Sequence, residues 1–146
     1  MTAFLGGFLR VLTIVAILMP LAVHAEQEQM PDRIPGSTLV SAEETAELML
    51  HTPGMVVIDS RHREEYDKAH IVGAVSLVDV EMTPEALVRL VPNKAAPVLF
   101  YCAGVGMHCL RSTHAVRNAL GWGYTRVYWF RGGMEEWAER KLPLEH

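Results

Sequence analysis

Apolar runs and amphipathic segments alternate along this chain. The segments MVVID (residues 55–59), PVLFYC (97–102) and TRVYWF (125–130) are dense in β-branched and aromatic side chains. Such unbroken apolar runs are typical of strands buried on both faces of a sheet. GAVSLV (73–78) predicts a further short strand.

The first predicted helix follows Ser41 in the segment SAEETAELML. Ser41 is a favourable N-cap, and Glu44 completes a capping box with it. Pro53 and the glycine after it end the helix. The apolar residues expected to turn toward the core are Ala42, Ala46, Met49 and Leu50.

Four later segments predict further helices. REEYDKAH (63–70) is short, and TPEALVRLV (83–91) begins with a threonine N-cap and a proline at the first helical position. RSTHAVRNALGWG (111–123) is closed by one of its last two glycines, and GMEEWAERKL (133–142) closes the chain. Strands that alternate with helices predict a small α/β domain with a mostly parallel central sheet.

The N-terminal segment has the layout of a secretory signal peptide. One positive charge, Arg10, precedes an apolar run to Val23, and a small residue, Ala25, stands where signal peptidase would cleave. A membrane-spanning helix needs about 20 apolar residues, whereas Arg10 and Pro20 frame a shorter run. We therefore expect a signal peptide over 1–25, a periplasmic or secreted protein, and membrane contact only through an uncleaved signal.

Composition narrows the possible partners. The chain has 146 residues, two cysteines and a formal net charge of −4. A mildly acidic chain without basic clusters argues against nucleic acid as a partner. After a lead over 26–37, we expect one domain over 38–146, and secretion would place both cysteines where disulfides persist.

Both cysteines lie in the segment YCAGVGMHCLRS (101–112). Cys102 ends a predicted strand, and ligands of parallel sheets bind beyond the carboxyl ends of strands. Glycines let the following backbone point N–H groups inward, and the next helix start and Arg111 add positive charge. These features favour a thiolate and would bind an oxyanion, which suits a substrate such as thiosulfate. The residues expected to contact it are Ala103, Gly104, Val105, Gly106, His108 and Ser112.

Two alternatives to a nucleophile remain for this segment. Cys102 and Cys109 could form an inert disulfide, although its short loop gains little entropy. A metal site would need more ligands than Cys102, His108 and Cys109, and adjacent His-Cys residues differ from the usual spaced zinc pairs. We favour the nucleophile and expect neither metal nor cofactor.

The chain resembles rhodanese-like domains over residues 38–145. VVIDSRHREEYDKAHIVGAVSL (56–77) is similar to their first signature, VYWFRGGMEEWAERKLPLE (127–145) to their closing one, and VLFYC before an Arg-Ser pair to their active loop. The resemblance implies a three-layer domain with a five-stranded, mostly parallel sheet and a persulfide on Cys102. Arg111 approximates the family's loop arginine, but it follows Cys102 by nine residues. That longer loop resembles a secreted subgroup with Cys…Cys-x-Arg-Ser.

Three residues outside this nucleophile have open or supporting roles. Cys109 is a small apolar residue, a resolving cysteine that attacks a Cys102 persulfide, or the partner of Cys102 in a resting disulfide. Asp59 and Arg61 are expected to support the site structurally. In this interpretation, Asp59 accepts turn N–H groups and Arg61 pairs with a carboxylate such as Glu65.

The leading hypothesis is a secreted sulfurtransferase that moves sulfane sulfur from thiosulfate or a persulfide to a thiophilic acceptor through Cys102. The alternatives are a thiol–disulfide redox protein that uses Cys102 and Cys109, and a non-catalytic rhodanese-like binding module. A cysteine phosphatase would need its arginine closer to the cysteine. The expected partners are a small sulfur-containing anion or a low-molecular-weight thiol, with a thiol reductant protein as a further candidate.

Overall fold

The computed structural model describes residue 2 and residues 28–146. The expected signal peptide over 1–25 lies, apart from residue 2, outside the described residues, so the signal and the localisation stay predictions. Within residues 28–146, no helix is long and apolar enough to cross a membrane.

A five-stranded sheet in the order β1-β6-β5-β2-β4 forms the centre of the domain, and all its neighbouring strands pair in parallel. This arrangement confirms the expected α/β class. The strands are β1 (Thr38–Leu39), β2 (Val56–Asp59), β4 (Val75–Ser76), β5 (Val98–Tyr101) and β6 (Val127–Phe130).

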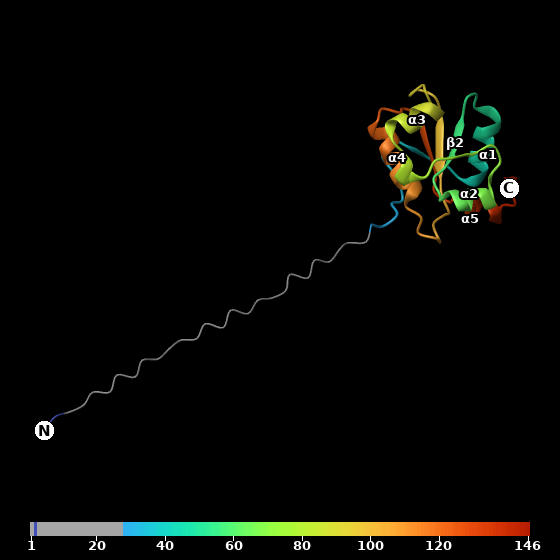
Figure 1. Cartoon of the computed structure of the whole chain (residues 1–146). Helices are drawn as coiled ribbons and strands as arrows, with labels where there is room; N and C mark the ends of the chain where they lie inside the picture. The colour runs from blue at the N-terminus through green and yellow to red at the C-terminus, as the bar shows by residue number, and fades with distance from the viewer. Residues whose placement is uncertain (1, 3–27) are drawn as a thin grey trace.

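Helices cover both faces of this sheet (Figure 1). Helices α3 and α4 pack on one face, and α1, α2 and α5 lie on the other. The helices are α1 (Ala42–His51), α2 (Arg63–Lys68), the 3₁₀ turn η1 (Asp79–Glu81), α3 (Pro84–Leu90), α4 (Arg111–Gly121) and α5 (Gly133–Glu139).

The inner strands are buried on both faces, as their unbroken apolar runs predict. Alternate side chains of a strand point to opposite faces, so the sheet separates two apolar clusters. Toward α3 and α4 the strands contribute Ile58, Phe100 and Trp129. Toward α1 and α5 they contribute Val57, Leu99, Tyr101 and Phe130.

Caps set several helix boundaries as expected. The Ser41 hydroxyl accepts from the Glu44 N–H at 3.2 Å, and Glu44 accepts from the Ser41 N–H at 2.8 Å. Helix α4 ends at Gly121, and Gly123 follows with φ of 90°. The expectation for Leu50 was wrong, because this side chain is 75% exposed. Leu50 directly follows Met49 and lies outside the face of α1 that packs on the core.

Two short pairings were absent from the sequence-based prediction. Strand β1 contains only two residues, and β3 (His70–Ile71) pairs antiparallel with β7 (Leu144–Glu145). The helix expected over 63–70 therefore ends at Lys68. Two-residue strands are too short to show a periodic pattern.

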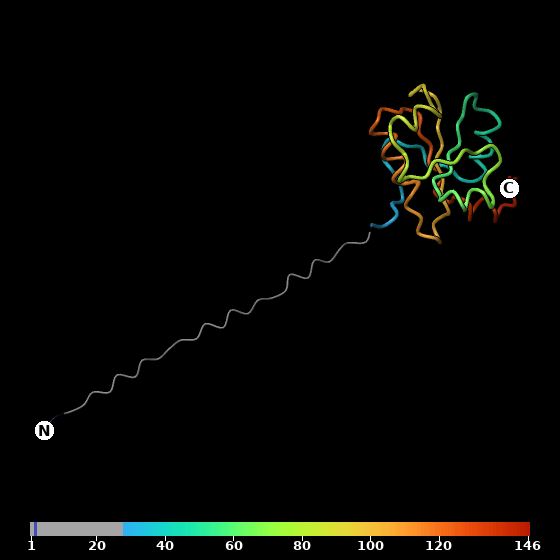
Figure 2. The backbone as a smooth tube through the Cα atoms, in the orientation of Figure 1, coloured from blue at the N-terminus to red at the C-terminus, as the bar shows by residue number. Residues whose placement is uncertain are grey.

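The loop between β5 and α4 projects beyond the carboxyl edge of the sheet (Figure 2). This is the edge at which the sequence places the reactive sulfur.

Candidate active site

Cys102 directly follows β5, and only 1% of its surface is exposed. Its carbonyl oxygen accepts from the Met134 N–H at 2.9 Å, in the first turn of α5. The loop is therefore fixed at its root by the helix that follows the neighbouring strand, β6.

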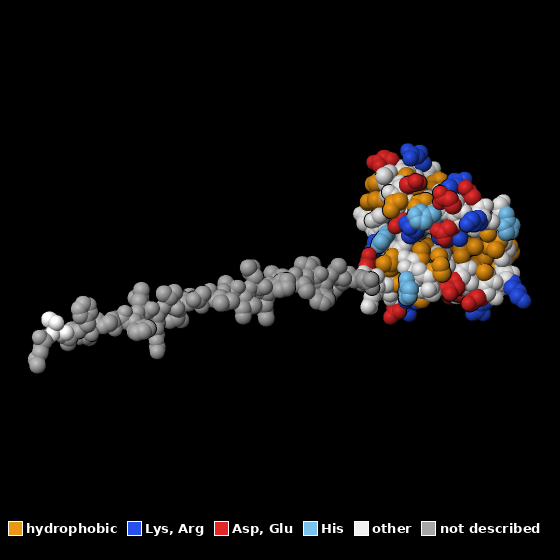
Figure 3. Space-filling model, turned by 60° about the horizontal axis from the view of Figure 1, so that its bottom comes forward, with side chains coloured by type: hydrophobic (Ala, Val, Ile, Leu, Met, Phe, Trp, Pro, Cys, Tyr) orange, Lys and Arg blue, Asp and Glu red, His pale blue; other side chains and the backbone are white. Residues whose placement is uncertain are grey.

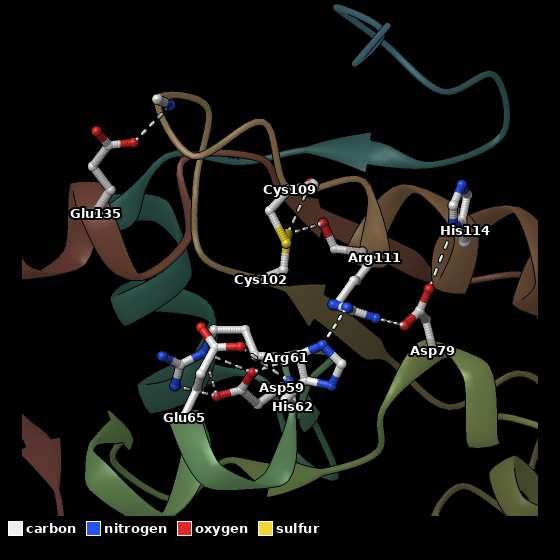
Figure 4. Close-up of a disulfide and its surroundings, with 12 residues drawn as sticks. Asp59, Arg61, His62, Glu65, Asp79, Cys102, Cys109, Arg111, His114 and Glu135 are labelled. Atoms are coloured by element: carbon white, nitrogen blue, oxygen red, sulfur yellow. Dashed lines mark hydrogen bonds and ion pairs between the residues drawn. A yellow bond between two sulfur atoms is a disulfide. The ribbon is translucent and has the colours of Figure 1, made fainter. Parts of the chain in front are cut away.

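Cys102 and Cys109 are joined by a disulfide in this structure (Figure 4). The Cα atoms lie 6.3 Å apart, within the normal span of a disulfide. Both thiols that a metal would need as ligands are consumed, and no three metal-binding side chains gather elsewhere within residues 28–146. The structure pairs Cys109 with Cys102, and the roles open for Cys109 stay predictions.

A buried hydrogen-bond chain reaches Cys102 from β6. The Trp129 indole N–H donates to Ser112 Oγ at 3.0 Å, and the Ser112 hydroxyl lies 3.3 Å from Cys102 Sγ. The exposure of all three residues is 1% or less. Ser112 is among the contact residues predicted from the sequence, whereas Trp129 is not. Strand pairing could have indicated this contact, because Trp129 pairs with Phe100, which lies two residues before Cys102.

Several loop N–H groups are already engaged in the disulfide form. The Gly106 N–H donates to Glu135 Oε2 at 2.8 Å. Those of His108 and Cys109 donate to loop carbonyls at 3.0 and 3.3 Å. In addition, the Cys109 carbonyl oxygen lies 3.0 Å from Cys102 Sγ. The three N–H groups would have to be released before an anion could bind them. Glu135, which holds the loop through Gly106, is a residue that the sequence did not reveal.

Glycines permit the close approach of α5 to the loop. Gly133 has φ of 56°, and a Cβ there would collide with the Cys102 carbonyl oxygen. Gly104 has φ of 138°, and a Cβ there would lie 2.7 Å from the Glu135 Cβ. Both positions require glycine for conformation and for space.

Arg111, the first residue of α4, directs its guanidinium toward Asp79 and His62 (Figure 4). Its guanidinium donates to Asp79 Oδ1 at 2.7 Å and also contacts the His62 ring. Burial disfavours the charge of Asp79, but hydrogen bonds from Arg111 and His114 outweigh it and hold the pKa of Asp79 below its usual value. Arg111 is thus paired rather than free.

This ion-pair network extends to the N-terminal lead. His114 Nε2 lies 2.9 Å from Glu28 Oε2, and Nδ1 lies 3.3 Å from Asp79 Oδ2. The hydrogen bond to Glu28, followed by that to Asp79, raises the pKa of His114 against the opposing effect of burial. Arg131 also contacts the N-terminal lead, because its Nε–H donates to the Pro31 carbonyl oxygen at 2.8 Å.

An open cavity of about 410 Å³ lies beside the disulfide. Cys109 lines it, whereas Cys102 does not. Figure 3, with this edge turned forward, shows histidine, basic and acidic side chains intermixed on this face. The cavity brings together some of the predicted contact residues with others that the sequence did not mark. Its lining is His62, Glu65, Asp79, Ala103, Met107, His108, Cys109, Leu110, Arg111 and His114.

The other predicted contact residues lie elsewhere. Val105 lines neighbouring cavities, one of which has a volume of about 660 Å³ and is shared with the N-terminal lead. Gly104 and Gly106 face α5, as their closeness to Glu135 shows. Ser112 is buried beneath Cys102.

Asp59 and Arg61 form a buried pair at the end of β2. Arg61 Nη2 lies 2.7 Å from Asp59 Oδ2, which also accepts from the Tyr101 hydroxyl at 2.8 Å. The Asp59 carboxylate accepts the Arg61 backbone N–H at 3.0 Å, as expected for a turn. Arg61 thus pairs with a carboxylate as expected. The carboxylate is not that of Glu65, which accepts from the His62 N–H at the start of α2. Asp59 is the carboxylate that pairs with Arg61 because it lies two residues away and is buried beside the guanidinium.

One family model identifies the family of this chain. The family model described as "Rhodanese-like domain" matches residues 41–140. The uncharacterized protein YibN of Escherichia coli K12 is 30% identical over 96 residues, which are 66% of this chain and 64% of that one. A tRNA uridine(34) hydroxylase of Teredinibacter turnerae is 30% identical over 75% of this chain and 33% of its own length. The chain thus spans less than two thirds of these curated relatives.

Solved structures agree. The BH2092 protein of Bacillus halodurans superposes with a TM-score of 0.66 and 25% identity, over 75% of this chain and 77% of that one. A thiosulfate sulfurtransferase of Pseudomonas aeruginosa superposes with a TM-score of 0.58 and 25% identity, over 75% of this chain and 20% of its own. The family model covers more than half of the chain, and the sheet order and the loop beyond β5 accompany it. The chain belongs to the rhodanese-like domain family.

Proposed function

We propose that this protein is a sulfurtransferase that carries sulfane sulfur as a persulfide on Cys102. The observation that carries the proposal is the position of Cys102. Its sulfur lies at the carboxyl end of β5, buried, 3.3 Å from the Ser112 hydroxyl at the start of α4. A hydroxyl donor and a helix N-terminus both stabilise a thiolate. The similarity to a thiosulfate sulfurtransferase structure supports the same activity.

The proposed reaction has two displacements. The Cys102 thiolate attacks the outer sulfur of thiosulfate, a bond forms between the two sulfurs, and sulfite leaves with the electrons of the broken S–S bond. An acceptor nucleophile then attacks the outer sulfur of the persulfide, and the Cys102 thiolate leaves. A persulfide donor would react in the same way, with a thiolate as leaving group. Ser112 acts in both steps by donating to the charge on Cys102 Sγ.

The disulfide defines a second state of this site. The Cys102 sulfur cannot attack a donor while it is bonded to Cys109, so the disulfide has to be reduced before sulfur transfer. The same bond favours a second candidate function, thiol–disulfide exchange through Cys102 and Cys109. The proposed partners are a small sulfur-containing anion, a low-molecular-weight thiol and a thiol reductant protein, in the periplasm or outside the cell.

Intact-mass measurement separates these functions. The purified protein is reduced, desalted, and weighed before and after thiosulfate, alongside Cys102→Ser and Cys109→Ser. Sulfur transfer predicts a gain of one sulfur atom in the wild type and in Cys109→Ser, and none in Cys102→Ser. Loss of two hydrogens that depends on both cysteines, without a sulfur gain, would favour thiol–disulfide exchange. No change in mass would favour a binding module.

A further inference from the structure

The two sulfurs of the disulfide are unequally accessible. Cys102 is 1% exposed and lines no part of the adjacent 410 Å³ cavity. Cys109 is partly exposed and lines that cavity. An external sulfur nucleophile can therefore approach Cys109, while the loop covers Cys102. In thiol–disulfide exchange, the accessibility of each sulfur is a main determinant of which of the two is attacked.

The two sulfurs also differ as leaving groups. Cys102 Sγ has the Ser112 hydroxyl at 3.3 Å, and the Trp129 indole N–H, 3.0 Å from Ser112 Oγ, orients that hydroxyl. Because Ser112 Oγ accepts from Trp129, its own hydrogen is directed to the sulfur. Among residues 28–146, no comparable donor contacts Cys109 Sγ. A sulfur whose thiolate is stabilised leaves faster.

We propose that this disulfide is opened from one side only: a low-molecular-weight thiolate in the cavity attacks Cys109 Sγ, and Cys102 leaves as the thiolate. This inference deepens the proposed function and rests on Cys102 as the sulfur carrier. Its consequence is that opening delivers Cys102 uncapped, with the incoming thiol attached to Cys109.

The step balances with two thiols. The first thiolate forms a bond to Cys109 Sγ, the Cys102–Cys109 bond breaks, and its electron pair stays on Cys102. A second thiolate attacks the sulfur of the bound thiol and releases Cys109 as a thiolate. Two thiols are thereby oxidised to their disulfide, and the protein disulfide is reduced to two thiols.

The cavity fits a small organic thiol. Its volume of about 410 Å³ lies within the range of small-molecule sites, roughly 300–1,000 Å³. Met107 and Leu110 contribute apolar side chains to the lining that Cys109 shares, while His62 and Arg111 contribute polar ones.

Trapping identifies the attacked sulfur directly. The oxidised protein is mixed with glutathione for short times and quenched with excess iodoacetamide, and the peptide that holds both cysteines is sequenced by fragmentation. The proposal predicts glutathione on Cys109 and the carbamidomethyl group on Cys102. Glutathione on Cys102 with the alkyl group on Cys109 would overturn it.

A rate measurement tests the leaving group even if the adduct is short-lived. Ser112→Ala removes the hydroxyl donor to Cys102, so opening by glutathione should slow about 3- to 10-fold. Ser60→Ala is the matched control, because Ser60 Oγ is also buried and has no hydrogen-bond partner among the described residues. Opening of Ser112→Ala at the wild-type rate would overturn the proposal.

Persulfide loading of the pre-reduced protein keeps the two proposals apart. Glutathione on Cys109 without any sulfur gain from thiosulfate would reject sulfur transfer and retain the direction of opening. A sulfur gain on Cys102 together with glutathione on Cys102 would support sulfur transfer and reject the proposed direction of opening.

Discussion

The Trp129 indole N–H donates to Ser112 Oγ at 3.0 Å, so a residue of β6 orients the hydroxyl that faces Cys102 Sγ. A serine hydroxyl has one hydrogen. Since its oxygen accepts from Trp129, that hydrogen is directed to Cys102 Sγ, 3.3 Å away. Trp129 is therefore a positioning residue, which acts on the sulfur through Ser112.

Ser112→Ala should make Cys102 less reactive at neutral pH. A hydrogen bond to a charged group contributes about 1.5–3 kcal/mol. Its loss should move the midpoint of the pH dependence of Cys102 alkylation upward by about 1 to 2 units. The measurement uses iodoacetamide on reduced Cys109→Ser, with and without the second substitution. An unchanged midpoint would show that Ser112 does not stabilise the thiolate.

Trp129→Phe should shift the same midpoint in the same direction by a smaller amount, because the hydroxyl is kept but is free to rotate. The buried ring also packs in the core, so unfolding by urea is measured in parallel. A purely packing role predicts lower stability with an unmoved alkylation midpoint. Trp137→Phe is the matched control, since Trp137 is equally buried but donates to the Pro143 carbonyl on the other face.

Arg61→Met should destabilise the fold strongly. It leaves the Asp59 carboxylate, which is 0% exposed, without its cationic partner, and breaking a buried pair costs about 3–5 kcal/mol. Arg63→Met removes an exposed pair with Asp67 and should cost less than about 0.5 kcal/mol. Urea unfolding of both variants measures the difference, and equal effects would show that the buried pair has no structural role.

Gly133→Ala should displace the active loop. A Cβ at Gly133 would collide with the Cys102 carbonyl oxygen, and the positive φ of this residue is unfavourable for any side chain. Gly73→Ala separates these causes, because Gly73 has φ of 76° but nothing within 4 Å of a Cβ. Both variants should lose about 1 kcal/mol from backbone conformation, and only Gly133→Ala should also lose Cys102 reactivity. Equal reactivity in the two variants would contradict the close approach of α5 to the loop.

Stability should depend on pH through His114. Its pKa is raised by Glu28 and then by Asp79, so the charged form is favoured in the folded state. That contribution is complete below the unfolded-state pKa of about 6.5 and is lost as pH rises through the folded pKa. The exposed position limits it to about 1 kcal/mol or less. Urea unfolding of wild type and His114→Gln from pH 5.5 to 8.5 should show a wild-type advantage that declines with pH, and a constant difference would contradict the network.

Asp79 contributes in a separate window. Its pKa is lowered, so its contribution is present above its unfolded-state value and is lost only as pH falls through the folded pKa. The decline between pH 5.5 and 8.5 therefore reports His114 alone among this pair.

The elements that determine the fold were predictable because they carry strong local patterns. The apolar runs that became β2, β5 and β6, and the Ser41 capping box, needed no tertiary information. Leu50 was misplaced because helical spacing does not show which apolar residue lies outside the buried stripe. The two-residue strands β3 and β7 depend on a contact between segments far apart in sequence.

The position of Cys102 at the end of β5 was predictable from the sequence, and the contacts around it were less so. A cysteine after a buried strand is a local signal, and so is the nearby second cysteine. Three contacts around the site join separate elements. They are the hydrogen bond from Trp129 to Ser112, the ion pair of Arg111 with Asp79, and the hydrogen bond from the Gly106 N–H to Glu135. Such pairings follow from how strands and helices pack, which no short motif encodes.

The most direct test of sulfur transfer is a single turnover with labelled sulfur. The reduced protein is incubated with thiosulfate labelled in its outer sulfur, desalted, and given a thiol acceptor. We predict that about one label per chain binds through Cys102 and then leaves with the acceptor. The pre-oxidised protein and Cys102→Ser should carry none. Failure of the reduced wild type to take up label, or label that stays on the protein when the acceptor is added, would contradict a Cys102 sulfur carrier.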